Sequence, residues 1–240
     1  MISVCMGTYN GQKYIKEQID SIISQLGIDD ELVISDDHSS DGTVDIIKSY
    51  NDSRIRFYLN ELQPGVTHNF ENALLKSKGD IIFLADQDDV WLPGKLSRMV
   101  QFMKNGGYDV VECNCSLTDS NMNIIKEQYY DENFLQVKSV WANFVRNSWL
   151  GCCMAFNRSF LEASLPFPKH VIAHDLWLCL FAQLHFKCGY MSDVLHLYRR
   201  HDNTVSFAGK KSTNSLLFKI KYRIYLAWHL LLRSFSLKKQ

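Results

Sequence analysis

The sequence contains no uninterrupted apolar stretch of the roughly 18 to 20 residues that a membrane-spanning helix requires. It also lacks internal repeats and low-complexity segments, and its first residues have neither the basic start nor the cleavage site of a signal peptide. Hydrophobic residues make up 46% of the chain, an ordinary fraction that argues against disorder. We therefore expect a folded protein without a leader peptide, located in the cytoplasm.

Cysteines in a zinc-binding spacing are lacking as well. The chain has seven cysteines, an odd number, and none of them forms the paired spacing of a zinc site. Cys113 and Cys115 are one residue apart, and Cys152 and Cys153 are adjacent. In apolar segments such residues behave as small core side chains. We expect free thiols in a reducing compartment.

No acidic residue follows Asp202, although the tail after it is strongly basic. The basic residues of the tail are Lys210, Lys211, Lys219, Lys221, Arg223, Arg233, Lys238 and Lys239. The whole chain has 26 basic and 26 acidic residues. The part up to Asp202 therefore has 18 basic and all 26 acidic residues, which gives it a net charge of −8. An acidic body with a basic tail argues against a nucleic-acid protein and favours a tail that meets an anionic surface. Residues 216–235 form a helix candidate that packs either on the body or on a membrane.

Short apolar strand candidates alternate with helix candidates in the first half of the chain. The strands are expected at 2–8, 31–35, 55–58 and 81–85, with amphipathic helical patterns between them. This order is typical of a parallel sheet with helices on both faces, so the fold class is α/β. The second half is less regular. Its clearest element is an apolar helix at 176–186, preceded by His174 and Asp175.

Acidic residues follow two of these strands. Ile81 to Ala85 is an unbroken apolar run, which is typical of a strand buried on both faces, and Asp86, Asp88 and Asp89 come directly after it. Asp36 and Asp37 follow the strand at 31–35. Carboxyl ends of parallel strands meet at one edge of the sheet, where ligands of such sheets bind. Three crowded carboxylates repel one another unless a cation lies between them, and Mg²⁺ accepts such ligands together with phosphate oxygens.

Three motifs in order resemble those of the inverting family-2 glycosyltransferases, which have the GT-A fold. They are Val4-Cys5-Met6-Gly7-Thr8-Tyr9-Asn10, then Ser35-Asp36-Asp37-His38-Ser39-Ser40-Asp41-Gly42-Thr43, then Ala85-Asp86-Gln87-Asp88-Asp89-Val90-Trp91. The third resembles enzymes that build bacterial O-antigen, capsule or other surface polysaccharide. The resemblance implies a catalytic domain at 1–207, with a nucleotide-binding half at 1–105 and an acceptor half at 106–207. A basic amphipathic tail at 208–240 would follow.

The resemblance also implies roles for single residues. Nucleotide-binding residues would be Thr8, Tyr9, Asn10, Asp36, Asp37 and Asp86. Asp88 would bind Mn²⁺ or Mg²⁺, with His201 as a further ligand. Contacts with the donor sugar or the diphosphate would come from Asp89, Trp91, Arg199 and Arg200. Asp175 lies where the family carries its catalytic base. The family commonly has Glu-Asp at this point, whereas this chain has His174-Asp175.

These residues imply one chemical mechanism. A divalent metal would neutralise the charge that develops on the leaving nucleoside diphosphate, and a carboxylate would accept the proton of the attacking hydroxyl. One base without an enzyme nucleophile means a single displacement with inversion. We expect a UDP-hexose or dTDP-rhamnose donor and a lipid-linked oligosaccharide acceptor. The enzyme would work at the inner face of the cytoplasmic membrane, where its tail meets anionic headgroups.

Structural explanations and other functions stay open at this stage. Acidic turns cap helices, and buried aromatic or basic side chains often only pack, which applies to Asp36, Asp37, Asp175, Tyr9, Trp91, Arg199, Arg200 and His201. Asp86-Gln87-Asp88-Asp89-Val90 also fits a phosphohydrolase of the haloacid-dehalogenase type, although that family places the motif on its first strand. A sugar nucleotidyltransferase would need a Gly-rich basic N-terminal loop, which is missing. A non-catalytic nucleotide-sugar binder or membrane-bound subunit is the alternative outside the enzymes.

Overall fold

The structure is a computed structural model, and it describes residues 1–131, 139–145, 147–201 and 215–237. The strands are β1 (Ile2–Thr8), β2 (Glu31–Asp36), β3 (Ile55–Leu59), β4 (Ile81–Asp86), β5 (Val90–Trp91), β6 (Val110–Thr118), β7 (Ile124–Lys126), β8 (Met154–Asn157) and β9 (Cys188–Arg199). The helices are α1 (Ile15–Ile23), α2 (Thr43–Ser49), α3 (Val66–Lys76), α4 (Lys95–Gly106), α6 (Val140–Val145), α7 (Arg158–Ser164), α8 (His174–His185) and α9 (Leu216–Leu237), with a short 3₁₀ turn η1 (Gly151–Cys153).

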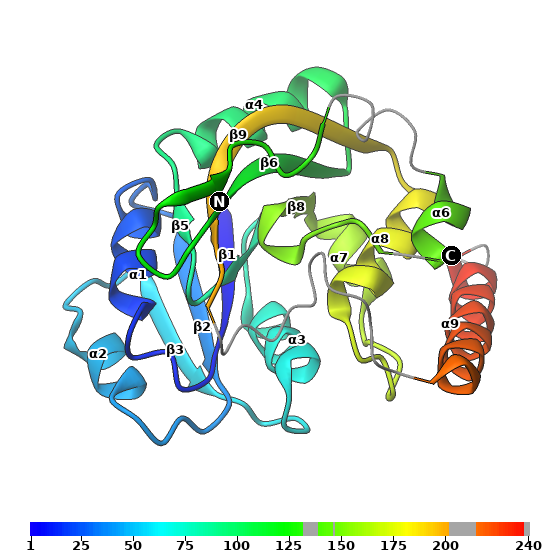
Figure 1. Cartoon of the computed structure of the whole chain (residues 1–240), viewed down its shortest axis with the longest axis horizontal. Coiled ribbons are helices and arrows are strands. Elements are labelled where there is room, and N and C mark those ends of the chain that lie inside the picture. Colours follow the sequence, from blue (N-terminus) through cyan, green and yellow to red (C-terminus); the bar gives the residue numbers. More distant parts are fainter. Residues whose placement is uncertain (132–138, 146, 202–214, 238–240) are drawn as a thin grey trace.

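One sheet runs through both halves of the described chain (Figure 1). Its order is β3-β2-β1-β4-β8-β6-β9-β5, with β7 paired to β6. The β3, β2, β1 and β4 neighbours are parallel, as the alternation of strands and helices predicts. Strand β8 is antiparallel to both β4 and β6, while β6 and β9 are parallel. The α/β prediction is therefore confirmed, and the regular parallel part is the first half.

The central strands are buried on both faces because their side chains alternate between two cores. Val4 and Phe83 point into a cluster with helices α1 and α4, whereas Cys5 and Leu84 point into a cluster with α3 and α8. All four side chains are fully buried. Continuous apolar runs at β1, β2 and β4 are thus explained, since neither face of these strands meets water.

Three elements outside the four parallel strands position the acidic motif. The segment after Tyr190 forms one long strand, β9, which begins at Cys188. A two-residue strand, β5, pairs antiparallel with β9 directly after the acidic motif. Helix α4 begins at Lys95, after a turn in which Gly94 has a φ of 83°, a value that favours glycine. The β5–β9 pair brings the C-terminal end of β9 beside the acidic motif.

Helix α9 lies at the edge of the molecule beside α6 and α8 (Figure 1). Leu226 and Leu230 are buried on its inner side and belong to the core around α8. Its outer side leaves large apolar residues exposed, among them Ile224 (65%) and Trp228 (59%). One side of α9 therefore packs on the body, while contact of its open side with a membrane stays a prediction. Among the described residues no helix is long and apolar enough to cross a membrane.

Candidate active site

The acidic motif forms the turn between β4 and β5. Asp86 is the last residue of β4, and its backbone carbonyl accepts a hydrogen bond from the Gln18 side chain of α1 at 2.7 Å. Because β1 and β4 are parallel neighbours, Gly7 of β1 lies opposite Asp86. Thr8 of β1 lies in turn opposite Asp36 of β2. The parallel register therefore brings the acids of β2 and β4 to one edge of the sheet, as predicted.

Asp88 and His201 lie in direct contact, although 113 residues separate them in the sequence. His201 Nε2 is 2.8 Å from Asp88 Oδ2, and both side chains remain partly exposed, at 13% and 17%. The His201 ring also packs on Tyr14, with ring centroids 4.8 Å apart. An imidazole and a carboxylate held together at the surface provide one nitrogen and one oxygen ligand for a cation.

Asp86 is partly exposed and lies close to two other acids. Burial, and then the negative charges of Asp88 and Asp175, raise the pKa of Asp86 above its ordinary value. Asp88 and Asp175 therefore lie near enough to Asp86 to destabilise its charged form. A divalent cation between them would remove this repulsion, which is the electrostatic situation of a metal site before the metal binds.

Asp89 does not face the donor, which corrects the prediction. Its carboxylate is fully buried, with Oδ1 accepting from the Arg199 backbone N–H at 2.8 Å and Oδ2 lying 2.7 Å from His196 Nε2. The other His196 nitrogen, Nδ1, is 3.1 Å from Lys95 Nζ, which also donates to the Cys152 carbonyl at 2.7 Å. An ammonium has no lone pair, so Nδ1 accepts from Lys95 and Nε2 donates to Asp89. Burial, reinforced by the Lys95 charge, lowers the pKa of His196 and keeps the ring neutral.

Arg199 is likewise committed to the protein itself, so its expected contact with the diphosphate is corrected too. Only 4% of the residue is exposed. Its guanidinium donates to the Asp88 carbonyl at 2.7 Å, forms an ion pair with Glu17 and covers the Tyr14 ring at 4.5 Å. Arg199 thus holds the acidic turn in place against helix α1. Arg200 is partly exposed and has no ion pair with any residue that the structure describes, so its expected contact with the diphosphate stays a prediction.

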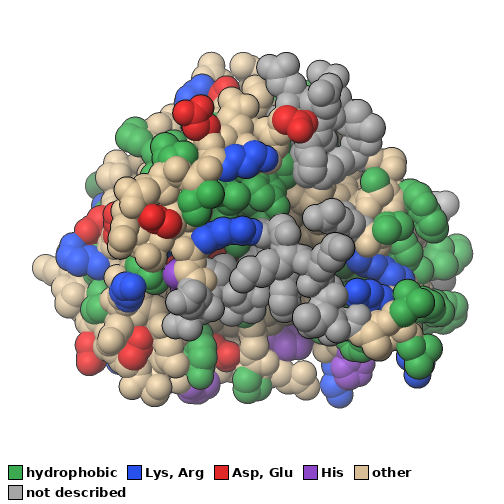
Figure 2. Space-filling model, in the orientation of Figure 1, with side chains coloured by type: hydrophobic (Ala, Val, Ile, Leu, Met, Phe, Trp, Pro, Cys, Tyr) green, Lys and Arg blue, Asp and Glu red, His purple; other side chains and the backbone are tan. Residues whose placement is uncertain are grey.

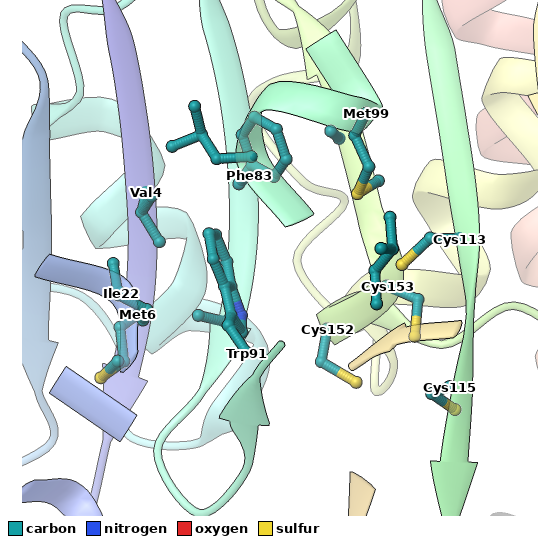
Figure 3. Close-up of a cluster of buried hydrophobic side chains, with 14 of the residues drawn as sticks. Val4, Met6, Ile22, Phe83, Trp91, Met99, Cys113, Cys115, Cys152 and Cys153 are labelled. Atoms are coloured by element: carbon teal, nitrogen blue, oxygen red, sulfur yellow. The ribbon is translucent and has the colours of Figure 1, made fainter. Parts of the chain in front are cut away.

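Trp91 is a core residue, which corrects its prediction as a donor contact. It has 2% of its surface exposed and lies in the cluster with Phe83, whose ring centroid is 5.6 Å away (Figure 3). Lys95 Nζ lies over its ring at 4.4 Å. Trp91 belongs to β5, and the pairing of β5 with His196 of β9 turns the indole inward. Figure 3 also shows four of the cysteines in this core. All seven cysteines are free, as predicted.

Trp91→Ala should therefore destabilise the fold rather than weaken donor binding. Removing a buried tryptophan costs about 3 to 5 kcal/mol of unfolding free energy because the core cannot fill the space. Urea titration followed by circular dichroism measures this loss. An unchanged midpoint, combined with a raised KM for the donor, would contradict the assignment of Trp91 to the core and restore the sugar contact.

Thr8, Asp36 and Asp37 hold the loops around the predicted nucleotide site. Asp36 is fully buried and accepts hydrogen bonds from Thr8 Oγ1 at 2.7 Å and from Ser39 Oγ at 2.6 Å. Asp37 accepts from the Asn60 side chain and from the Gly65 N–H, each at 2.7 Å. In this conformation Asp36 is inaccessible to solvent, so a direct contact with a nucleotide, which stays a prediction, would require Ser39 to move.

Gln87 is a site residue that sequence reasoning missed. Its amide accepts from the Tyr9 N–H at 2.9 Å and donates to the Tyr9 carbonyl at 2.9 Å, which ties the acidic turn to the end of β1. Tyr9 is 56% exposed and presents its ring to solvent, as a residue that contacts a base must. Asn10 accepts from the Ser40 N–H at 2.8 Å and donates its own N–H to Ser39 Oγ at 2.8 Å. Its role in nucleotide binding stays a prediction.

Asp175 lies in the first turn of α8, partly exposed and close to Asp86. Burial raises the pKa of Asp175 to about 6, although hydrogen bonds from the Leu176 N–H and the Asn147 side chain oppose the rise. The backbone of Gly151 runs beside it, where an added Cβ would lie 3.6 Å from Asp175 Cβ. A carboxylate of raised basicity in this position has the property that a general base needs near neutral pH.

His174 precedes Asp175 and is almost fully buried, with 7% of its surface exposed. Its ring stacks on Phe70 with centroids 4.2 Å apart, and burial lowers its pKa to about 4. A neutral imidazole therefore fills the place where the resemblance leads one to expect a glutamate. Nε2 has no hydrogen-bond partner among the described residues.

The side chains at the surface of the site are of types that bind a divalent cation, although of these described residues only Asp88 and His201 are in direct contact in this conformation. Asp86, Asp88 and His201 supply carboxylate oxygens and one imidazole nitrogen, a donor set that Mn²⁺ accepts. A deeper group, Asp86, Asp89 and Cys152, has ligand atoms within 4.8 Å of one another. Both Asp89 oxygens are already bonded, however, and Asp89 and Cys152 are fully buried. We therefore favour the outer set as the metal ligands.

The family model described as "Glycosyl transferase family 2" matches residues 3–165. A UDP-Glc:alpha-D-GlcNAc-diphosphoundecaprenol beta-1,3-glucosyltransferase of Escherichia coli is 27% identical over 212 residues, covering 86% of this chain and 79% of that protein. A GalNAc(5)-diNAcBac-PP-undecaprenol beta-1,3-glucosyltransferase of Campylobacter jejuni is 29% identical over 244 residues, covering 95% and 71%. An uncharacterized glycosyltransferase of Methanocaldococcus jannaschii is 34% identical over 225 residues, covering 90% and 77%.

Solved structures show the same fold. S. aureus TarS in complex with UDP-GlcNAc superposes with a TM-score of 0.70 at 18% identity, covering 98% of this chain and 72% of that one. In another structure, of S. aureus TarS 1-349, the matched share of that chain is 60%. The mannosyltransferase PcManGT of Pyrobaculum calidifontis, in complex with GDP-Man and Mn²⁺, has a TM-score of 0.66 at 20% identity, covering 99% and 74%.

These matches agree with the position of the acidic motif, which follows the fourth strand, whereas a haloacid-dehalogenase phosphohydrolase carries it on the first. They cover both halves of the sheet and the acidic edge at which β1, β2 and β4 end. Relatives with related sequences are named for surface polysaccharide synthesis, including a teichuronic acid and an O-antigen glycosyltransferase. The chain belongs to glycosyl transferase family 2 and is a glycosyltransferase with a GT-A-like fold.

Proposed function

We propose that the protein is a metal-dependent inverting glycosyltransferase that moves a hexose from a UDP-sugar to a lipid-linked saccharide acceptor. The observation that carries this proposal is the contact of Asp88 with His201 beside Asp86, which feels the charges of both Asp88 and the more basic carboxylate of Asp175. The relatives in E. coli and C. jejuni are named as beta-1,3-glucosyltransferases acting on undecaprenol-linked saccharides. UDP-glucose is therefore the first donor to test, with dTDP-rhamnose as the second.

Asp88 and His201 would hold Mn²⁺ or Mg²⁺, and Asp86 would complete the ligand set or contact the ribose. When bound, the metal supplies positive charge for the diphosphate leaving group. The protein's own residues do the rest. Tyr9, held by Gln87, would contact the base. Arg200, which directly precedes His201 and is partly exposed, would contact the diphosphate.

Asp175 would take the proton from the attacking acceptor hydroxyl. A general base must be unprotonated and yet basic enough to accept a proton, and a pKa of about 6 meets both needs near pH 7. We place the acceptor hydroxyl next to Asp175, opposite the metal and the leaving group. Attack from that side in a single displacement inverts the anomeric carbon. The beta linkage in both relatives' names supports inversion, since UDP-glucose is an alpha-linked donor.

A transfer assay tests this function directly. Purified full-length protein is incubated with Mn²⁺, UDP-glucose and a synthetic GlcNAc-diphosphate-alkyl acceptor, and the product is analysed by mass spectrometry and NMR. We expect one added hexose with a beta linkage. Release of inorganic phosphate from sugar phosphates, without transfer to the acceptor, would favour the phosphohydrolase instead. Donor binding without turnover of any acceptor would favour the non-catalytic binder.

We also propose that the protein works at the inner face of the cytoplasmic membrane and that α9 attaches it to anionic lipid. Helix α9 has no acidic residue, and its open side carries apolar side chains next to lysines and arginines (Figure 2). This combination is typical of helices that lie in the interface plane of a bilayer. The lipid-linked acceptors in the relatives' names support the same location.

Replacing the three exposed residues Ile224, Trp228 and Leu231 by serine should release the protein from membranes. Each large side chain that leaves lipid loses about 1.5 kcal/mol or more, so we expect at least a tenfold lower partition coefficient. Flotation with phosphatidylglycerol vesicles measures it. Ile28→Ser is the matched control, because Ile28 is 91% exposed in the loop between α1 and β2. Equal flotation of the triple variant and the control would remove α9 as the attachment.

A further inference from the structure

Arg223 of α9 is a half-buried cation without an acidic partner. No carboxylate of the described residues forms an ion pair with it, and burial lowers its pKa. Its Nη2 donates to the Val145 carbonyl at 3.0 Å, whereas Nη1 is buried and has no hydrogen-bond partner in the described part of the chain. Leaving a buried guanidinium N–H unsatisfied is costly, so such a group usually meets an anion.

Arg233, on the same helix, is a comparison case because both of its terminal nitrogens form hydrogen bonds. Its Nη1 donates to the carbonyls of Ala163 and Leu165, and its Nη2 donates to the Pro166 carbonyl at 2.6 Å. Arg233 therefore closes the C-terminal end of α7. Arg223 has one such bond only, and its planar group is held over the Phe144 ring of α6 at 5.6 Å. The unsatisfied edge of Arg223 is thus fixed in direction, and because Nη1 is buried, a ligand reaches it only after the atoms that cover it move.

Tyr222 connects this cation to the catalytic base. The Ile172 N–H donates to the Tyr222 hydroxyl at 3.1 Å, and the His170 N–H donates to the Tyr225 hydroxyl at 3.0 Å. These bonds attach α9 to the segment that leads into Asp175. Burial raises the pKa of Tyr222 to about 12, with the Arg223 charge opposing the rise and the Asp175 charge adding to it. Tyr222 therefore lies within electrostatic reach of both residues.

The open side of α9, which we propose meets the membrane, lies beside the same cation. Its open side exposes Ile224, directly after Arg223, and Trp228 one turn further on. Trp141 of α6 is 72% exposed and stacks on Phe144, the ring beneath the guanidinium. A lipid-linked acceptor has its anionic phosphates between its lipid and its saccharide. The protein shows the same order: an apolar face for the lipid, then an arginine for the phosphates, then the proposed catalytic base for the saccharide.

We propose that Arg223 binds the phosphate or diphosphate ester that joins the saccharide of the acceptor to its lipid. Once Nη1 is uncovered, its N–H and the second N–H of Nη2 would match two phosphate oxygens in bidentate geometry. The inference rests on the proposed function for its acceptor class. The bilayer's own phosphate headgroups have the same chemistry, so the experiment must separate the two sources.

The first measurement is calorimetry of the full-length protein with decyl diphosphate in the presence of EDTA, which keeps metal-dependent binding out of the donor site. We expect Arg223→Met to bind roughly ten- to a hundredfold more weakly than the wild type, as the loss of a charged hydrogen-bond pair implies. Lys221→Met removes the same charge from an exposed position on α9 and should keep wild-type affinity. Arg223→Lys should be intermediate, because lysine keeps the charge without the bidentate fork.

The second measurement identifies the source of the phosphate. Flotation on phosphatidylglycerol vesicles should differ less than twofold between wild type and Arg223→Met, whereas the KM for GlcNAc-diphosphate-decyl should rise at least tenfold. The KM for decyl GlcNAc, which lacks phosphate, should not change. A matching loss of flotation would assign Arg223 to headgroups and overturn the proposal, as would equal decyl diphosphate binding by Arg223→Met and wild type. If neither acceptor is glycosylated, the proposed function fails. The calorimetric comparison then still shows whether Arg223 binds a diphosphate.

Discussion

Asp175→Asn should lower kcat by roughly 100- to 10,000-fold, which is the usual contribution of a general base. The substitution keeps the shape of the side chain and its hydrogen bond with the Leu176 N–H, but the amide cannot accept a proton. The KM for the donor should change little, because Asp175 faces the acceptor in the proposed mechanism. Initial rates with saturating UDP-glucose and Mn²⁺ measure the effect.

The pH dependence of the wild type follows from the same residue. Burial raises the pKa of Asp175 to about 6, so the base is ionised above pH 6 and protonated below it. The value of kcat should therefore be constant near pH 8. Below pH 6 it should decrease, and the decrease should approach a factor of ten for each pH unit. The remaining activity of Asp175→Asn should lack this step. A wild-type profile that is flat between pH 5 and pH 8 would contradict Asp175 as the base.

The thermal stability of Asp175→Asn is an internal control for its loss of activity. A carboxyl whose pKa is raised in the folded state costs stability above that pKa, because the folded protein holds the proton more tightly than the unfolded chain. This cost is present at pH 8 and disappears as the pH falls below the ordinary value of 3.8. Asp175→Asn should therefore unfold at an equal or higher temperature than the wild type at pH 8. Lost activity together with lower stability would point to a structural role.

Asp88→Ala should lower kcat/KM by roughly a thousandfold or more in the presence of Mn²⁺. The metal contributes several kcal/mol to the neutralisation of the leaving group, and each 1.36 kcal/mol is a factor of ten in rate. The substitution removes one carboxylate ligand and leaves His201 Nε2 without its partner at 2.8 Å. Addition of Mn²⁺ up to millimolar concentration should restore little, which kinetic titration with the metal measures.

Asp80→Ala is the matched control for this loss. Asp80 precedes β4, at the strand end opposite Asp86, and its side chain is 82% exposed. Both variants remove one negative charge from the ends of the same strand. Unchanged kinetics in Asp80→Ala and a large loss in Asp88→Ala would locate the effect at the acidic turn. Equal kinetics in both variants would exclude Asp88 as a metal ligand.

The sequence predicts the parallel part of the fold well because its signals are local. Apolar runs that end in Asp36 and in Asp86 identify strands, and the parallel register then brings both acids to one edge. The contact between Asp88 and His201 is different, since no local pattern joins residues 113 apart. Only the resemblance to a family placed them together, and the structure confirms that they meet.

The mistaken assignments all depend on the pairing of β5 with β9. This two-residue pair is too short to leave a periodic signal, yet it turns Trp91 into the core and places His196 against Asp89. It also buries Arg199 beneath the turn. A sequence alone shows that these residues are polar or aromatic near a motif. It does not show whether they face the ligand or support the loop that does.

Lys95 is a further residue that local reasoning misses. It begins helix α4 and would be taken for a solvated charge, but it is fully buried and bonded to His196 and to the Cys152 carbonyl. Its burial is possible because two distant segments, η1 and β9, supply its hydrogen-bond partners. Gln87 was likewise unremarkable in sequence, although it joins the ends of β1 and β4. Such supporting residues are found from contacts and not from motifs.

Calorimetry of the purified protein with UDP, dTDP and GDP, each in Mn²⁺ and then in EDTA, tests the central claim most directly. The account predicts that UDP binds in Mn²⁺, that EDTA abolishes or strongly weakens this binding, and that Asp88→Ala does not bind it in either condition. Binding that is equal with Mn²⁺ and with EDTA, or no binding of any of the three nucleotides, would contradict a metal-dependent donor site formed by Asp88 and His201.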